Sequence, residues 1–304
     1  MGKAFYDYNS ESKKIFDAAE EVIPGILEKI FNGSAEDLKQ TSLTQPAIFI
    51  ASCAAFKAFQ ARFSDFESSI GAAAGHSLGE YSALFAAKVF DFKIGLKLVE
   101  YRGQILERAC LQFPGSMAAI LGIGRDQLGS LCQIAENGGE VCEMVNFNCP
   151  GQIVAAGTAK GIASLAKKVQ GTAGAKAIPL AVSGPFHSSL LAQAAKEMEE
   201  KLAPAALKDA KIDVYSNCDA RPERSAEQIR KNLVTQIDHA VLWEDSIRAM
   251  IAKGIETFIE IGPGKVLSGL LRKTDRKIRA LNIEDPESLN KTLEILKFTE
   301  VSAK

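Results

Sequence analysis

Apolar and polar positions follow a helical period in some segments of the chain and form short continuous apolar runs in others. An amphipathic helix is expected over residues 10–31, interrupted near Pro24, and a second from an N-cap at Thr44 to about Phe63. Further helices are expected after Asp91, a candidate N-cap, and at 226–235, 240–253 and 286–298. Apolar runs that suit buried strands lie at 70–74, 212–216, 255–261 and 277–282. This alternation predicts an α/β protein with a largely parallel sheet.

Residues 114–184 follow a different order. Strands are expected at 117–121, 141–147, 152–156 and 175–179, with helices at 125–135 and 159–169. This β-α-β-β-α-β order predicts a ferredoxin-like unit, and Gly-Pro punctuation at residues 114–115 and 184–185 marks its two ends. We therefore expect a larger α/β subdomain of residues 1–113 and 185–304 with residues 114–184 inserted in it, and a substrate in the cleft between them.

Composition excludes several classes of protein. The 304 residues are 47% hydrophobic and 24% charged, as in a globular protein, and the net charge of −1 disfavours a nucleic-acid binder. No apolar run reaches membrane-spanning length, and the polar start is no signal peptide. The six cysteines form no C-x-x-C pair, and there are only three histidines. The sequence thus predicts a cytoplasmic protein with reduced thiols and no metal site.

The segment Gly75-His76-Ser77-Leu78-Gly79 carries the candidate chemistry. This G-x-S-x-G sequence lies between an apolar strand and a helix start, which is the context of a nucleophile elbow. There, both glycines are expected to avoid clashes where the strand and the helix cross. The competing interpretation is that Ser77 merely caps the helix, and the motif alone does not decide between the two.

A serine nucleophile needs a base and donors for the developing oxyanion. His76 is adjacent to Ser77 and points elsewhere, and His239 follows Asp238 as a plausible helix cap, whereas His187 opens a helix at the subdomain junction. The backbone N–H of Leu78 is a candidate oxyanion donor because it starts a helix. Glu80, one turn into that helix, is interpreted as a partner of the helix dipole with no part in the chemistry.

Several blocks resemble the malonyl-CoA:acyl carrier protein transacylases, in the order and spacing of that family. They are the segments at 75–84, 101–104, 115–119, 146–152, 184–189 and 260–267. The resemblance implies an α/β-hydrolase-like body with an inserted ferredoxin-like subdomain. It also implies a ping-pong transfer of malonyl from malonyl-CoA to the phosphopantetheine thiol of acyl carrier protein, without a bound cofactor. We expect the protein to be a monomer.

The resemblance also implies roles for individual residues. Ser77 would be the nucleophile and His187 the base, oriented by the backbone carbonyl of Gln236 in place of an aspartate. Arg102, which by itself looks like an ordinary surface arginine of a helix, would bind the free carboxylate of malonate. Phe186 matches the malonyl-selective pattern and leaves little room for the methyl group of methylmalonate.

One block of the family has no counterpart here. Family members begin with a strand of the central sheet and a glutamine-containing loop that supplies a second oxyanion contact, ahead of a Met-Gly like Met1-Gly2. Either the start lies at an internal methionine, which we favour, or the protein is a truncated and weakened form. Loss of one oxyanion donor typically costs about 10²–10³ in rate.

Alternatives stay open at this stage. They are an acyltransferase for polyketide assembly, a serine thioesterase or other hydrolase, and an inactive remnant that still binds a carrier protein. A basic run at 272–279 suits either coenzyme A phosphates and an acidic carrier protein or an ordinary solvated face.

Overall fold

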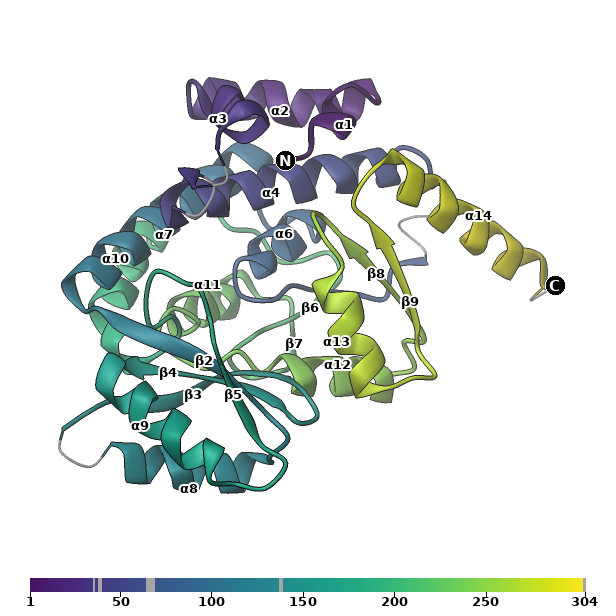
Figure 1. The fold of residues 1–304 in the computed structure, drawn as a ribbon. Helices are drawn as coiled ribbons and strands as arrows, with labels where there is room; N and C mark the ends of the chain where they lie inside the picture. Colours follow the sequence, from purple (N-terminus) through teal and green to yellow (C-terminus); the bar gives the residue numbers. More distant parts are fainter. Residues whose placement is uncertain (35, 38–39, 64–68, 137–138, 303–304) are drawn as a thin grey trace.

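The N-terminal part of the chain is helical. In this computed structural model, residues 1–34, 36–37, 40–63, 69–136 and 139–302 are described. Helices α1 (Lys3–Tyr6), α2 (Ser10–Val22) and α3 (Ile26–Asn32) lie along the long helix α4 (Thr41–Gln60), as Figure 1 shows. The expected interruption near Pro24 is confirmed, because α2 ends at Val22 and α3 begins at Ile26.

The expected N-cap of α4 is wrong. The helix begins at Thr41 with Gln40 as its N-cap, so Thr44 lies inside the first turn. Its hydroxyl donates to the carbonyl of Gln40 at 2.9 Å, which satisfies the side chain within the helix. Pro46 is accommodated two residues later, so neither residue marks the boundary.

Two segments of the chain, before and after residues 114–184, build the larger part of the molecule. The first holds β1 (Ala72–Ala74), α6 (Gly79–Ala86) and α7 (Phe92–Gln112), whose expected cap Asp91 accepts from the N–H of Ile94. The second runs through η2 (Ser189–Leu191), α10 (Ala192–Leu202), β6 (Asp213–Tyr215), β7 (Pro222–Glu223), α11 (Ala226–Thr235), α12 (Trp243–Ala252), β8 (Thr257–Ile261), α13 (Val266–Thr274), β9 (Arg279–Ile283) and α14 (Pro286–Ser302).

The expected parallel pairing is present, but it is divided between two small sheets. Strand β1 is parallel to β6, which pairs with β7, and β8 is parallel to β9. Among the described residues no strand joins β1 to β8, and residues of both line one cavity of about 860 Å³. Helix α4 contributes apolar side chains such as Phe56 to its wall, and α12 and α13 contribute others such as Trp243 and Leu271.

Residues 115–179 form the β-α-β-β-α-β order that the sequence predicts. The elements are β2 (Gly115–Leu121), α8 (Arg125–Ala135), β3 (Cys142–Cys149), β4 (Gln152–Thr158), α9 (Ala159–Gln170) and β5 (Lys176–Pro179). The four strands form an antiparallel sheet in the order β3-β4-β2-β5, which is the ferredoxin-like arrangement. Leu128 and Leu165, from the two helices, are fully buried in a hydrophobic cluster with Ile120 of the sheet.

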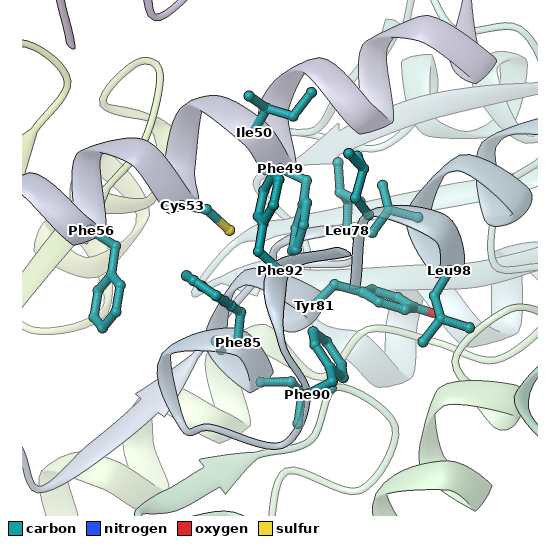
Figure 2. Packing of buried hydrophobic residues seen from close by; sticks show 14 of the residues in the cluster. Phe49, Ile50, Cys53, Phe56, Leu78, Tyr81, Phe85, Phe90, Phe92 and Leu98 are labelled. Atoms are coloured by element: carbon teal, nitrogen blue, oxygen red, sulfur yellow. The ribbon is translucent and has the colours of Figure 1, made fainter. Parts of the chain in front are cut away.

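Aromatic packing fixes the helix that follows Ser77. Figure 2 shows rings from α4, α6 and α7 meeting in one cluster, with Phe49 stacked on Phe92 at 5.7 Å between ring centroids. Phe85 of α6 contacts both rings edge-on, and Tyr81 of the same helix is fully buried. The start of α6 is therefore anchored in the core. No helix of the described residues is both long and apolar enough to cross a membrane.

Candidate active site

Ser77 lies in a sharp turn between β1 and α6. Its backbone φ is 50°, a left-handed conformation that is uncommon for a non-glycine residue. A Cβ added at Gly75 would lie 2.0 Å from the carbonyl carbon and oxygen of Gly79, so only glycine fits there. A Cβ at Gly79 would meet no atom within 4 Å, so the expectation of a steric need for glycine is wrong at this position.

His187 faces Ser77 from the turn that precedes η2. It is 6% exposed, its φ is 65°, and its Nε2 lies 2.7 Å from Oγ of Ser77. Its Nδ1 lies 2.7 Å from the carbonyl oxygen of Gln236. A carbonyl only accepts, so Nδ1 carries the proton and Nε2 is left to accept the proton of Ser77.

Burial keeps the imidazole of His187 neutral. It lowers the pKa of His187 to about 3, and the positive charge of Arg102 contributes to the same shift. At neutral pH the ring is therefore unprotonated and able to act as a base. The hydrogen bond from Nδ1 to Gln236 opposes the shift by favouring the protonated ring.

Arg102 is a buried cation beside this pair. It projects from α7, is 2% exposed, and its Nη2 donates to Oγ of Ser77 at 3.1 Å and to Oε1 of Gln236 at 3.0 Å. Its Nη1 donates to Oε1 of Gln45 at 2.7 Å. These acceptors are neutral, and among the described residues no carboxylate is hydrogen-bonded to the guanidinium, which therefore presents a positive charge next to the serine. The structure thus places Arg102 in the site and not on the surface.

Two further polar residues of the site, and one further side chain, were not identified from the sequence. The residues are Gln45 and Asn217, which lies two residues after the end of β6, and the side chain is that of Gln236. Asn217 accepts from the N–H of Ser77 at 2.6 Å and donates to the carbonyl of Gly75 at 2.8 Å, so it holds both sides of the turn. A polar residue at the carboxyl end of a strand parallel to β1 was an available signal for Asn217. Gln45, embedded among the apolar residues of α4, gave none.

Leu78 and Phe186 flank the serine and the histidine. Leu78 is the N-cap residue of α6, and no acceptor for its N–H is found among the described residues. That N–H is therefore available to an oxyanion beside Ser77. The half-buried ring of Phe186 packs against the core of the larger part and against a cluster of the four-stranded sheet that includes Met117 and Val145.

The other histidines lie outside the pair. His76 is partly buried and shares a 2.9 Å hydrogen bond with Oδ1 of Asn148, and burial lowers its pKa. His239 is exposed and paired with Asp238 at 2.6 Å. Among the described residues no cluster of three metal-ligating side chains is found, and the six cysteines are unbridged. From the basic run, Arg272, Lys273 and Arg276 line a cavity of about 550 Å³ with Pro150.

The assembled geometry suits acyl transfer through a serine nucleophile. It contains an activated serine, a neutral base oriented by a carbonyl, an available N–H donor and a buried cation within reach of the nucleophile. A family described as the acyl transferase domain matches residues 1–292. A relative from Bacillus subtilis (strain 168), a malonyl CoA-acyl carrier protein transacylase, is 42% identical over 301 residues, 98% of this chain and 93% of that protein.

The chain belongs to this transacylase family. The resemblance drawn from the sequence blocks is therefore confirmed. An acyl-carrier-protein S-malonyltransferase from Bartonella henselae superposes with a TM-score of 0.93 at 33% identity, covering 98% of this chain and 95% of that chain. A malonyl-transacylase solved in complex with a type II PKS acyl carrier protein superposes with a TM-score of 0.91 at 33% identity, covering 97% and 94%. These likenesses also confirm the α/β fold class.

Proposed function

We propose that this chain transfers the malonyl group of malonyl-CoA to the phosphopantetheine thiol of acyl carrier protein through a malonyl ester of Ser77. The observation that carries the proposal is the position of Arg102, whose guanidinium donates to Oγ of Ser77 at 3.1 Å. A buried cation beside the nucleophile suits an acyl group that carries its own carboxylate. A simple hydrolase of neutral esters has no use for that charge.

In the first half-reaction Nε2 of His187 takes the proton of Ser77 while Oγ attacks the thioester carbonyl. The N–H of Leu78 donates to the oxyanion of the tetrahedral intermediate. The intermediate collapses with cleavage of the carbon–sulfur bond, and His187 returns the proton to the departing coenzyme A thiolate. The carbonyl of Gln236 stabilises the imidazolium that exists between these two proton transfers.

The second half-reaction reverses these steps with another thiol. His187 takes the proton of the phosphopantetheine thiol, and the thiolate sulfur attacks the malonyl-Ser77 ester. Collapse breaks the bond to Oγ, which regains its proton from His187. Throughout, the malonyl carboxylate accepts from Arg102 in place of Gln45 and of Oγ of Ser77, while Gln236 keeps its hydrogen bond to Nη2. Pairing also offsets the charge that lowers the pKa of His187, so malonyl binding makes His187 a stronger base.

Several wider statements belong to the same proposal. The division into residues 1–113 with 185–304 and an inserted part at 114–184 is supported by the separate antiparallel sheet and its own hydrophobic cluster. We assign the chain to fatty-acid synthesis in the cytoplasm, acting as a monomer on acyl carrier protein and without a bound cofactor. The net charge of −1 supports the lack of a nucleic-acid partner.

Intact-protein mass spectrometry after brief mixing with malonyl-CoA tests the proposal. We expect one malonyl adduct on the unmodified chain, none on Ser77→Ala, and loss of the adduct when phosphopantetheinylated acyl carrier protein is added. An adduct that survives Ser77→Ala contradicts the assignment of the nucleophile. Release of free malonate without carrier protein, at a rate comparable to transfer, favours the hydrolase instead.

A further inference from the structure

Glu80 is a buried carboxylate that the reaction described above does not use. It is the second residue of α6 and is 2% exposed, whereas an ordinary partner of the helix dipole faces solvent. A buried carboxylate is costly unless hydrogen-bond donors surround it. The partners of Glu80 therefore show what its burial achieves, and the earlier interpretation of this residue as a dipole partner alone is incomplete.

Both donors to Glu80 belong to residues that hold the reacting groups. Its Oε2 accepts from the backbone N–H of Asn217 at 3.0 Å and from Nε2 of Gln236 at 2.8 Å. The Asn217 side chain bonds to both sides of the turn that carries Ser77. Gln236 is the residue whose carbonyl orients the base.

The Gln236 side chain links Glu80 to the remaining parts of the site. Its Nε2 also donates to the carbonyl of Ser77 at 3.0 Å, and its Oε1 accepts from Nη2 of Arg102. With Nε2 held by acceptors, Oε1 has to face the guanidinium, which fixes which way the amide points. Reversal of that amide would set an NH₂ group against a cation.

We propose that Glu80 is a positioning residue that, through Gln236 and Asn217, holds the base, the carboxylate-binding arginine and the nucleophile turn in one arrangement. The inference rests on the proposed function, because it assigns Glu80 a role only through Ser77, His187 and Arg102. Glu80 itself touches no substrate atom in the proposed reaction.

The surroundings of Glu80 make the ionised form of its carboxyl group unfavourable. Burial raises the pKa of Glu80 to about 7, and the charge of Asp219, in the loop after β6, acts in the same direction. The two hydrogen bonds and the positive charge of Arg102, from α7, lower it in part. A carboxyl group accepts through its carbonyl oxygen even when protonated, so the positioning role needs an acceptor at Oε2 and not a charge.

Three substitutions of Glu80 distinguish a need for a hydrogen-bond acceptor at Oε2 from a need for a negative charge. Glu80→Gln keeps an acceptor of the same reach, Glu80→Met keeps the length and removes the acceptor, and Glu80→Asp keeps the charge and withdraws it from Gln236. Glu20→Ala is the matched control, because Glu20 also accepts two hydrogen bonds, from the backbone N–H groups of Gly25 and Leu27 in the distant α2–α3 turn. Ser77→Ala, run in parallel, reports separately on the proposed function.

Rapid-quench mass spectrometry with malonyl-CoA and with acetyl-CoA gives two numbers for each variant, the rate constant and the final acylated fraction. We expect Glu80→Met to lower the rate constant about 10–100-fold for both thioesters with an unchanged final fraction, because displaced reacting groups slow each turnover. Glu80→Asp should lie between, and Glu80→Gln and Glu20→Ala should stay within about 3-fold of the unmodified chain.

The opposite pattern overturns the inference. If Glu80 only supports the fold, its substitution lowers the final acylated fraction, which counts folded sites, and leaves the rate constant of those sites unchanged. If Glu80→Met yields no folded protein, the comparison of Glu80→Asp with Glu80→Gln decides, and equal rate constants in that pair contradict the positioning role. Normal rates in every Glu80 variant, with Ser77→Ala inert, reject the inference while leaving the proposed function intact. Acylation of Ser77→Ala rejects the proposed function and the inference with it.

Discussion

Oγ of Ser77 and Nε2 of His187 lie 2.7 Å apart, and both residues have left-handed backbone conformations, with φ of 50° and 65°. Such conformations cost non-glycine residues about 1–2 kcal/mol each and persist only where the surroundings enforce them. Asn217 bonds to both sides of the turn at Ser77, and the carbonyl of Gln236 holds the ring of His187. The strain thus follows from turning the two side chains toward each other.

The two glycines of the nucleophile turn should differ strongly in their tolerance of alanine. Gly75→Ala forces a Cβ to 2.0 Å from the backbone of Gly79, and we expect the free energy of unfolding to fall by about 3 kcal/mol or more. Gly79→Ala meets no atom within 4 Å and should change it by less than about 1 kcal/mol. Urea unfolding followed by circular dichroism measures both. Equal losses in the two variants would contradict the steric account of the turn.

Arg102→Ala should separate malonyl from acetyl transfer. Loss of a charge-assisted bond to the malonyl carboxylate should slow Ser77 malonylation about 100-fold, and acetylation by less than about 5-fold. Rapid-quench acylation with the two thioesters gives the ratio. Arg108→Ala is the control, because Arg108 lies on the same helix, is exposed and pairs with Glu197. A parallel decline of both reactions would show that Arg102 does not recognise the carboxylate.

The low pKa of His187 predicts an unusual pH profile for Ser77 acylation. A histidine with an ordinary pKa of about 6.5 would lose base activity about tenfold per pH unit below that value. With a pKa of about 3, His187 stays unprotonated, and the rate constant should be flat from pH 8 down to about pH 5. Arg102→Ala removes a charge that lowers this pKa, so its acidic limb should lie at higher pH. An acidic limb near pH 6.5 in the unmodified chain would contradict the low pKa of His187.

The local pattern of the sequence was enough to place most elements. Helices α8 and α11 have the predicted bounds, because apolar spacing within each segment indicates them. In α11 the Ser225 side chain also caps the first turn by accepting from the N–H of Gln228. The order β3-β4-β2-β5 follows from recognising one supersecondary unit. The separation of β1 from β8 could not be predicted, because apolar runs reveal strands but not which strand edges meet.

The site shows the same division between local and tertiary information. Ser77 is found from a local motif, whereas Arg102 is distinguished from a surface arginine only by the family resemblance. The network of Glu80, Asn217 and Gln236 joins positions up to 156 residues apart in the chain. No periodicity or spacing reveals that Glu80 turns inward, because its position in the first turn of a helix is equally compatible with solvent.

Phe186 provides a test of selectivity. Its ring, directly before the base, should limit the space beside the malonyl α-carbon, so Phe186→Ser should raise the ratio of methylmalonyl to malonyl transfer. One methyl group in an apolar pocket is worth about 10–200-fold, and we expect a shift of at least about 10-fold. Competition assays with both thioesters measure it, with Phe113→Ser, at the exposed end of α7, as control. An unchanged ratio would mean that another residue sets the limit.

Strand β8, which lines the cavity together with β1, should be less protected than the central strand β4 of the four-stranded sheet. Strand β4 is hydrogen-bonded to β3 on one side and to β2 on the other, whereas among the described residues β8 pairs only with β9. Alternate N–H groups along β8 therefore have no strand partner, and local opening exposes the others at lower cost. Hydrogen exchange followed by mass spectrometry should show a fast and a slower group of amides in residues 257–261. Residues 152–158 should show only slow exchange, at least about 10-fold slower than the fast group after correction for intrinsic rates. Equal protection of the two strands would mean that the β8 edge is covered in solution.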